Sequence, residues 1–501
     1  MKKIVLYPLL ALLAVLASCT GKFEEYNTNP ENPREGDTDP ITLIEDLIAS
    51  SASDLQHRSW QCHSEIMQYT VDVGNSTRYS LYRFPASIFE TLWNTFYTHA
   101  ANADDVVRQA RKYEEPNLEA MGITLKVMYF AILTDMYGDV PYSEALRIKE
   151  GVTQPRMDRQ RDIYEGLIGE LLAANDLYVT SQSLLVPAKD LLYGGDIAKW
   201  KKFTNSLCLR LCLRLSNRPE SIGLETLKII VENPGVYPIF TSAADDAKIA
   251  FSGVVPFRGP FGGMTDGNFT SSSHKCSERF VDRLYKTYDP RRSVWTTQPG
   301  DEAKGVPSGW VDPDGTGCVY LNTKVLKPYD APAWFMTASE VKFILAEAAL
   351  QGYIAGGEAA AKSYYEEAIA ASVNQWNPKI TPADLEKFIN GAGSEVRFDG
   401  TLERIIEQKW VSLFMQGFES WNDYRRTGYP QLVIGGGAAE VNGGILPTRM
   451  LYGQTTISTN ADHYAAEVAY LRAAYPGVGG DNMRTPVWWS RRAVELENAN
   501  R

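Results

Sequence analysis

The strongest constraint on this chain is the recurrence of apolar residues three and four positions apart, which is the spacing of one face of an α-helix. The segment from Leu118 to Tyr137 is apolar on nearly every side, so we expect a helix buried between other helices. Between Thr401 and Gly417 the large apolar side chains form one stripe: Leu402, Ile405, Ile406, Trp410, Leu413 and Phe414. The spacing therefore predicts a mainly α-helical protein.

The predicted helices follow one another in pairs. The pairs are 89–113 with 118–137, 162–177 with 197–215, and 339–351 with 357–375. Helical hairpins of about thirty residues, with large and small side chains alternating, are typical of tetratricopeptide-like units. The full signature of that repeat is absent, so an irregular helical domain is the alternative. The expected fold class is a tetratricopeptide-like scaffold of helical pairs with a loop-rich, irregular face.

Two long segments lack the helical spacing. In the first, periodicity survives only around Glu278 to Tyr288, and glycine and proline are frequent elsewhere. The second contains three consecutive glycines at 435–437. Loops on a rigid helical scaffold are the usual place for binding residues. The predicted organisation is helical pairs within about 85–215 and 334–428, a loop-rich binding region at about 236–333, and an irregular C-terminal part at 428–501.

The N-terminus has the layout of a secretory signal peptide. Lys2 and Lys3 precede an apolar run from Ile4 to Ala17, which is shorter than the roughly 20 residues of a membrane span. The run closes on Leu-Ala-Ser-Cys, which resembles a bacterial lipobox whose cysteine, here Cys19, is lipidated and becomes the mature N-terminus. We expect a signal peptide at 1–18 and a lipidated, flexible tether at 19–40. The alternative for Cys19 is a buried or disulfide-bonded cysteine.

The residues after Cys19 suggest where the tether leads. Glu24 and Glu25 lie close to the predicted lipid, as in the surface-export signal of Bacteroidetes lipoproteins, which this acidic stretch resembles. The alternative is an ordinary solvated linker. We therefore expect a protein anchored in the outer membrane and facing the cell exterior.

The composition excludes nucleic acid as a partner and indicates aromatic rings on the surface. Lysine and arginine total 50 against 61 acids, a net charge of −11, so no electrostatic footprint for nucleic acid is present. The 27 tyrosines, 18 phenylalanines and 11 tryptophans exceed what a core of this size needs, so we expect some rings on the surface. The five cysteines after Cys19 give no argument for a disulfide framework.

Motifs of catalysis are missing from the sequence. The nucleophile elbow, the zinc-protease motif, the P-loop and the dinucleotide-binding fingerprint do not occur. The segment from Asp312 to Gly317 looks like the start of a calcium loop, but Pro313 and the missing glutamate at the twelfth position argue against an EF-hand. We predict no catalytic residues, no cofactor and no metal; a glycoside hydrolase is the remote alternative, since no spacing rule excludes its two carboxylates.

One turn-forming segment carries a family resemblance. Residues 135–145 follow the buried helix and read D-M-Y-G-D-V-P-Y-S-E-A. Together with the lipobox, this segment resembles the SusD/RagB family of outer-membrane lipoproteins. Further matches lie at Asn27 to Pro33, Tyr288 to Arg291, Glu407 to Trp410 and Gly417 to Gly428.

The resemblance implies a fold and a role. Family members have four tetratricopeptide-like helical pairs with a loop-rich face, and they cover a SusC-like TonB-dependent outer-membrane transporter as a lid. The implied function is capture of a glycan or a peptide at the cell surface and its delivery to the transporter, without catalysis. The family's binding aromatics lie on variable loops, so none is carried over here, and we expect Tyr137, Tyr142, Trp421 and Tyr424 to pack helix ends.

Candidate binding residues are therefore chosen on physical grounds. A sugar presents apolar C–H faces ringed by hydroxyl groups, so its site needs exposed flat rings beside amide or carboxylate groups. Two loops combine these residue types. The first loop contributes Trp295, Trp310, Tyr320, Asp312 and Asn322, and the second contributes Tyr79, Tyr82, Phe84, Asn75 and Arg78.

The net charge also bears on the cargo. An acidic surface tolerates neutral polysaccharide and disfavours a polyanionic glycan, unless a local basic patch such as Arg291–Arg292 overrides it. Neutral or basic peptides are the alternative cargo in the same architecture. A helical-repeat adaptor that binds only protein is the alternative from another class.

Overall fold

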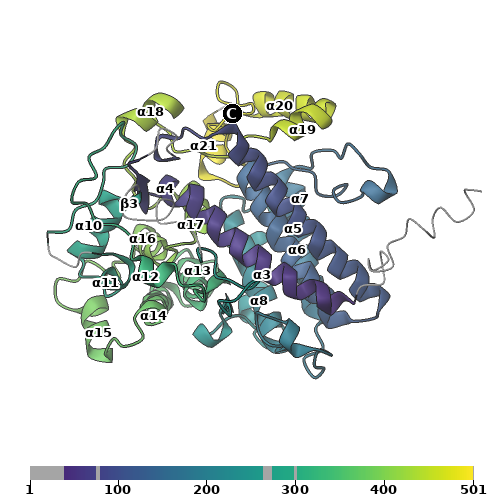
Figure 1. Ribbon diagram of the computed structural model, residues 1–501, viewed down its shortest axis with the longest axis horizontal. Helices are drawn as coiled ribbons and strands as arrows, with labels where there is room; N and C mark the ends of the chain where they lie inside the picture. Colours follow the sequence, from purple (N-terminus) through teal and green to yellow (C-terminus); the bar gives the residue numbers. More distant parts are fainter. Residues whose placement is uncertain (1–38, 75–78, 263–273, 298–301, 500–501) are drawn as a thin grey trace, which may run out of the picture.

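The computed structural model describes residues 39–74, 79–262, 274–297 and 302–499. Figure 1 shows the N-terminal helices as the right half of the molecule, the helices of the middle of the chain as the left half, and the C-terminal helices along the upper edge. The long helices are α3 (Pro40–Arg58), α5 (Ala86–Lys112), α6 (Pro116–Tyr137), α7 (Gln160–Leu177), α8 (Ile197–Arg214), α13 (Ala338–Leu350), α14 (Gly357–Trp376) and α20 (Ala461–Ala474).

The pair α5–α6 is built on the buried helix that the sequence predicts. Side chains are buried on all sides of α6, as its apolar composition requires. A Cβ atom at Gly122 would lie 2.9 Å from Val107 Cγ2, so the glycine permits the close approach of the two helices. The helix ends at Gly138, whose φ of +81° favours glycine. The other predicted pairs, α7–α8 and α13–α14, are confirmed with boundaries shifted by a few residues.

Shorter elements connect the pairs. The remaining helices are α4 (Ser64–Ile66), α9 (Gly223–Glu232), α10 (Glu278–Lys286), α11 (Arg292–Trp295), α12 (Thr323–Leu326), α15 (Pro382–Asn390), α16 (Leu402–Ser412), α17 (Gly417–Thr427), α18 (Gly436–Asn442), α19 (Gln454–Thr459) and α21 (Arg491–Ala499). The π-helical turn η1 spans Ser59–His63, and the 3₁₀ turns are η2 (Tyr79–Leu81), η3 (Ile148–Glu150), η4 (Pro187–Lys189), η5 (Leu215–Asn217) and η6 (Ala243–Asp245).

Strands form two small antiparallel ladders. Strand β1 (Thr70–Asp72) pairs with β3 (His274–Cys276), and β2 (Ala247–Ile249) pairs with β4 (Ala333–Met336). Within the described ranges, no helix is long and apolar enough to cross a membrane.

The C-terminal part contains helices that the sequence analysis did not anticipate. Residues after 428 form α18 to α21, whereas an irregular segment is expected there. Helix α18 is short and rich in glycine, and α20 is rich in alanine and mostly exposed, with only Glu467 and Leu471 buried. Neither helix has the apolar stripe that identifies an amphipathic helix, which is why the spacing missed them.

The aromatic residues of the family-like segments pack within the protein, although only Tyr137 and Tyr424 lie at or near helix ends; Trp421 is in the middle of α17 and Tyr142 lies outside the helices. Tyr137 is fully buried and its hydroxyl donates to the Phe89 carbonyl at 2.6 Å. Trp421 is also fully buried, and its Nε1 donates to the Pro447 carbonyl at 2.8 Å. Tyr142 is half-buried and donates to Glu170, while Tyr424 is half-buried near the end of α17. These contacts give the rings a packing role.

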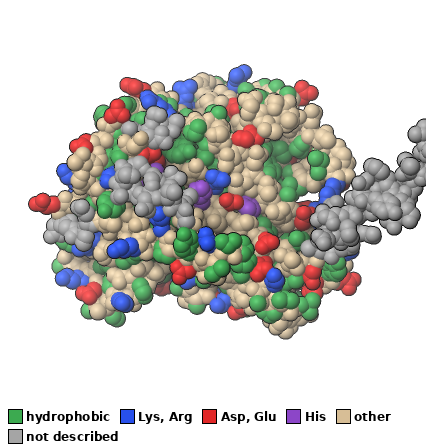
Figure 2. Space-filling model, viewed as in Figure 1, with side chains coloured by type: hydrophobic (Ala, Val, Ile, Leu, Met, Phe, Trp, Pro, Cys, Tyr) green, Lys and Arg blue, Asp and Glu red, His purple; other side chains and the backbone are tan. Residues whose placement is uncertain are grey.

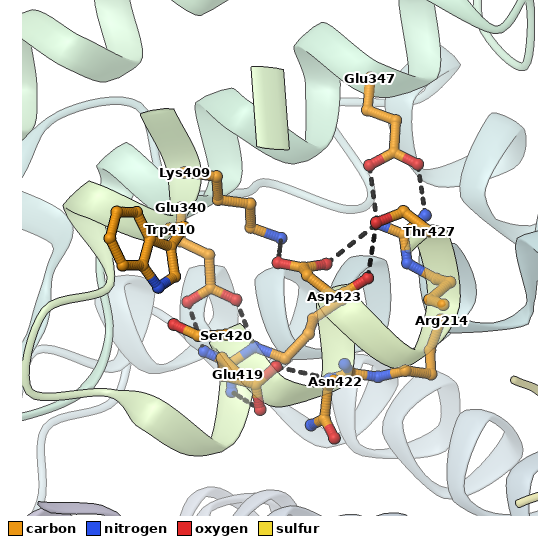
Figure 3. Close-up of polar contacts among 12 residues, drawn as sticks. Arg214, Glu340, Glu347, Lys409, Trp410, Glu419, Ser420, Asn422, Asp423 and Thr427 are labelled. Carbon is orange, nitrogen blue, oxygen red and sulfur yellow. Dashed lines mark hydrogen bonds and ion pairs between the residues drawn. The ribbon is translucent and has the colours of Figure 1, made fainter. Parts of the chain in front are cut away.

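A buried charge network joins helices from distant parts of the chain, and Figure 3 shows it around α17. Lys409 Nζ lies 2.8 Å from Asp423 Oδ2, and Arg426 Nη2 lies 2.9 Å from Asp423 Oδ1. Arg426 also pairs with Glu347 of α13, with Nη2 and Oε2 2.7 Å apart. These four side chains are at most 7% exposed, so their charges face one another away from water.

The network continues toward α6 and α8. Arg214 Nη2 lies 2.5 Å from Glu419 Oε2, and Arg210 binds both carboxylate oxygens of Glu340 at 2.7 and 2.6 Å. Asp135, in the last turn of α6, accepts from Trp489 Nε1 at 2.9 Å. Bidentate pairs between arginine and carboxylate are strong and fix the relative orientation of the groups. The network therefore connects α6, α8, α13, α16, α17 and the C-terminal segment.

The cations around Asp423 stabilise its ionised form. Burial alone would raise the pKa of Asp423, but the neighbouring cations of Lys409, Arg426 and Arg214 lower the pKa to about 2. A carboxyl group whose pKa is lower in the folded chain than in the unfolded chain stabilises the fold. The contribution is fully present when the pH is above the pKa of the unfolded chain, here 3.8. That contribution is lost as the pH falls from about 4 toward 2.

We predict that Asp423→Ala destabilises the protein at pH 7 by about 3–5 kcal/mol, because it leaves Lys409 and Arg426 buried without their shared carboxylate. Urea unfolding measures the effect, and the difference from wild type should shrink below pH 4. The matched control is Glu495→Ala, which removes a carboxylate from the exposed pair with Arg491. Equal losses of stability in the two variants would contradict the account.

Candidate ligand-binding face

The two loops selected from the sequence meet at a third segment, the start of α18. Leu81 of η2, in the second loop, and Val311 of the first loop both pack against Gly437. A Cβ atom at Gly437 would lie 2.8 Å from Val311 Cγ2 and 2.9 Å from Leu81 Cδ2. Only a residue without a side chain permits this approach, so the glycine run brings the loops together.

Backbone contacts fix the first loop on α18. The Ala438 amide donates to the Gly309 carbonyl at 3.0 Å. A Cβ atom at Gly435 would lie 2.5 Å from the Gly309 carbonyl carbon, which is closer than any side chain permits. Figure 1 places α18 at the upper left end of the molecule. The loop before Trp310 is thus held against a helix by main-chain atoms.

Trp310 is the exposed ring of this face. Its indole lies over Gly436, where a Cβ atom would be 3.3 Å from Trp310 Cζ3, and the side chain remains 51% exposed. Val311 and Asp312 follow it and are also exposed. A flat ring supported on one side and open on the other, next to a carboxylate, can stack on a sugar and accept hydrogen bonds from its hydroxyls.

The other loop contributes two half-buried rings. The Tyr79 and Phe84 rings are tilted against each other with centroids 5.5 Å apart. The backbone of η2 is anchored from below, because the Ser80 amide donates to Glu65 Oε2 at 2.9 Å. Burial raises the pKa of Glu65 to about 8, with a smaller opposing effect of the hydrogen bond from Ser80. The η2 turn is therefore fixed by a buried acid.

Two further candidates from the sequence are already engaged within the protein. Tyr320 is half-buried, and Lys275 Nζ lies 5.1 Å from its ring centroid. Asn322 is the N-cap of α12: its Oδ1 accepts from the Lys324 amide at 3.2 Å and its Nδ2 donates to the Val294 carbonyl at 3.1 Å. The side chain of Asn322 is thus used for local structure.

Two candidates are wrong as exposed rings. Trp295 is fully buried, because the short helix α11 inserts its indole against Phe280 and Phe414, with centroids at 6.0 and 4.6 Å. Tyr82 is 3% exposed and belongs to the main core. Asn75, Arg78 and Cys19 lie outside the described residues.

Two exposed rings outside this surface, and the part that α18 plays in it, were not anticipated. Tyr288 and Tyr329 are 62% and 49% exposed, and neither was a candidate. The glycine run at 435–437 is the sequence signal that could have indicated close packing of a loop on α18. The partner of that packing is more than a hundred residues earlier in the chain, and the sequence does not identify it.

An open cavity of about 570 Å³ lies apart from α18, between α3, α5 and the loop at 251–258. Its walls include three acids, Asp46, Asp54 and Asp105, together with Phe251 and Phe257. Both phenylalanines are at least half-buried. Neither phenylalanine in this cavity is as exposed as Trp310, so the α18 face has the better composition for a sugar.

The surface charge does not form one field on the face seen in Figure 2. Acidic and basic side chains are interspersed there, with apolar side chains between them. A mixed surface neither attracts nor repels a neutral ligand at long range. Contact chemistry at the exposed rings therefore decides what such a face can bind.

Comparison with known proteins gives the same architecture. Residues 30–453 match the SusD-like family described as "Starch-binding associating with outer membrane". A solved structure of a chitin-binding protein is 26% identical, with a TM-score of 0.76, and the match covers 90% of this chain and 100% of that one. No curated protein matches the chain.

Two more solved structures share the fold. A SusD homologue from Bacteroides fragilis is 22% identical, with 90% and 99% of the two chains covered and a TM-score of 0.75. A chitin-binding SusD homologue from Flavobacterium johnsoniae is 22% identical, with 89% and 98% covered and a TM-score of 0.73.

The fold and these matches define a helical-pair protein of an outer-membrane-associated class. The family match covers most of the chain, and the chain belongs to the SusD-like family. The predicted fold class and the resemblance of residues 135–145 are thereby confirmed.

Proposed function

We propose that this protein captures a glycan at the cell surface and passes it to a partner TonB-dependent transporter, without catalysis. The observation that carries the proposal is Trp310, a half-exposed indole on a loop fixed to α18 by main-chain contacts. Membership of a family described as starch-binding and similarity to two chitin-binding structures support a saccharide as the ligand.

The face suits an extended sugar chain. Trp310 supplies a flat ring, and Tyr79 and Phe84 lie on the neighbouring loop across the glycine run. Rings held in place before binding lose little conformational freedom when a sugar stacks on them. The exposed carboxylate of Asp312 can accept hydrogen bonds from sugar hydroxyls. Among the rings proposed from the sequence, Trp310, Tyr79, Phe84 and Tyr320 remain candidates.

The proposed location rests on the N-terminal sequence and on the family. Lipidation of Cys19 would anchor the chain in the outer membrane, since two or more acyl chains give stable membrane attachment. The acidic residues after Cys19 favour the exterior face. The family description associates such proteins with the outer membrane. A SusC-like transporter is the proposed partner.

We predict that Trp310→Ala weakens binding of a neutral polysaccharide by about fivefold, because one stacked ring contributes about 1 kcal/mol. Affinity electrophoresis in gels containing starch, chitin-derived or other neutral polysaccharides measures retention. The control is Tyr113→Ala, which removes an exposed ring at the end of α5, away from α18. Unchanged retention of Trp310→Ala would move the site elsewhere, and retention by peptides alone would favour the peptide alternative.

We predict that Cys19→Ala abolishes attachment to the outer membrane. The wild-type protein, solubilised from outer membranes in mild detergent, should carry palmitate and co-purify with a large β-barrel protein. The variant should be absent from the membrane fraction and carry no palmitate. Palmitate on the variant would contradict Cys19 as the site of lipidation. Purification of the wild-type protein without a β-barrel protein would contradict the proposed transporter partner.

A further inference from the structure

An open pocket of about 1060 Å³ lies on the opposite end of the left half of the molecule from α18. It is formed by the turn after α10, the segment between α14 and α15, and the loop after α15. Figure 1 shows α15 at the lower left and α18 at the upper left, so the pocket and the Trp310 face are separate. Its volume is at the upper end of the range of small-molecule sites, about 300–1,000 Å³.

Basic side chains dominate the walls. The pocket is lined by Lys286, Arg292, Lys379 and Lys387. Lys286 is paired with Asp282 at 2.5 Å. For the other three cations, no carboxylate among the described residues forms an ion pair. Three cations thus face an open pocket in a chain whose net charge is −11.

The acids in the wall offset only part of this positive charge. Asp384 Oδ2 accepts from the Thr381 hydroxyl at 2.7 Å, at the start of α15. Glu395 Oε2 lies 3.7 Å from Arg283 Nη1, outside the basic group. Glu395 is thus paired with Arg283, while Asp384 keeps its charge. The three unpaired cations outnumber Asp384, so the pocket presents a net positive charge to a ligand.

The basic patch considered from the sequence, Arg291–Arg292, is divided by the fold. Arg291 is fully buried and binds Asp289 through Nη2 and Oδ2 at 2.7 Å, so it is closed to ligands. Arg292 points to the pocket instead, with its guanidinium 5.3 Å from the Tyr288 ring centroid. The prediction of a basic patch is therefore wrong for Arg291. Lys379 and Lys387 supply the further positive charge beside Arg292.

Tyr288 adds a flat ring to this charge. Its side chain is 62% exposed, and its backbone adopts a φ of +52°, which is uncommon for a residue other than glycine. Such a conformation costs of the order of 1 kcal/mol and persists where the surrounding structure imposes it. The turn thus holds the ring at the pocket mouth beside a guanidinium.

We infer that this pocket is a second saccharide site, which takes a sugar bearing carboxylate or sulfate groups. Tyr288 stacks on the apolar face of the sugar, and Arg292 binds two oxygens of the anionic group through its planar guanidinium. Lys379 and Lys387 attract the same group as point charges. The inference goes beyond the capture of neutral glycan at the Trp310 face and does not depend on it.

Titration calorimetry with three tetrasaccharides tests the site: a galacturonate oligomer that carries carboxylates, a carrageenan fragment that carries sulfates, and neutral maltotetraose. We expect at least one acidic probe to bind, with an affinity that falls between about 50 mM and about 300 mM salt. The double variant Lys379→Ala, Lys387→Ala should lose about tenfold or more in that affinity. Tyr288→Ala should weaken binding while leaving its salt dependence unchanged.

The matched control is the double variant Lys228→Ala, Lys362→Ala, which removes the same charge from exposed positions on α9 and α14. It should bind the acidic probe within about twofold of wild type. If only one acidic probe binds, that probe identifies the anionic group that the site takes. Binding of either acidic probe, or of both, supports the site. Failure of both probes to bind, or equal losses in the two double variants, overturns it. Trp310→Ala should leave binding of the acidic probe unchanged, so failure of this site and failure of the neutral-glycan site are distinguishable.

Discussion

The arginine–carboxylate network around α17 is the contact on which the arrangement of the helices depends. It joins Asp135 of α6, Arg210 and Arg214 of α8, Glu340 and Glu347 of α13, and the two late helices α16 and α17. Such pairs contribute little net stability when compared with an apolar core, but losing one partner strands a buried charge. The network therefore selects one packing of these helices over others with a similar apolar area, which we take as its role here.

The binding face inherits its rigidity from this network. Lys409 of the network is followed by Trp410, whose Nε1 donates to the Met67 carbonyl at 3.0 Å and whose ring stacks on Tyr69 at 5.0 Å. That stretch leads directly into β1. Buried Glu65 holds η2, which carries Tyr79, through the Ser80 amide. Tyr79 is therefore presented by a turn whose backbone is held in place before any ligand binds.

The helical scaffold was predictable because its signals are local. Apolar spacing identified α5, α6, α7, α8, α13 and α14, and the segment at 135–145 identified the family. The candidate site was predictable only in part. Trp295 and Trp310 both stand in segments rich in glycine and proline, yet Phe280 and Phe414 bury the first and Gly436 supports the second at the surface. These contacts join residues far apart in the sequence, so local composition cannot separate the two tryptophans.

The central claim is that the exposed rings serve capture of a glycan without its cleavage. The most direct measurement incubates the purified protein with a panel of neutral polysaccharides and records both retention and the release of reducing ends. The account predicts retention of at least one polysaccharide with no reducing ends released above the background without protein. Release of reducing ends in proportion to the amount of protein would contradict it.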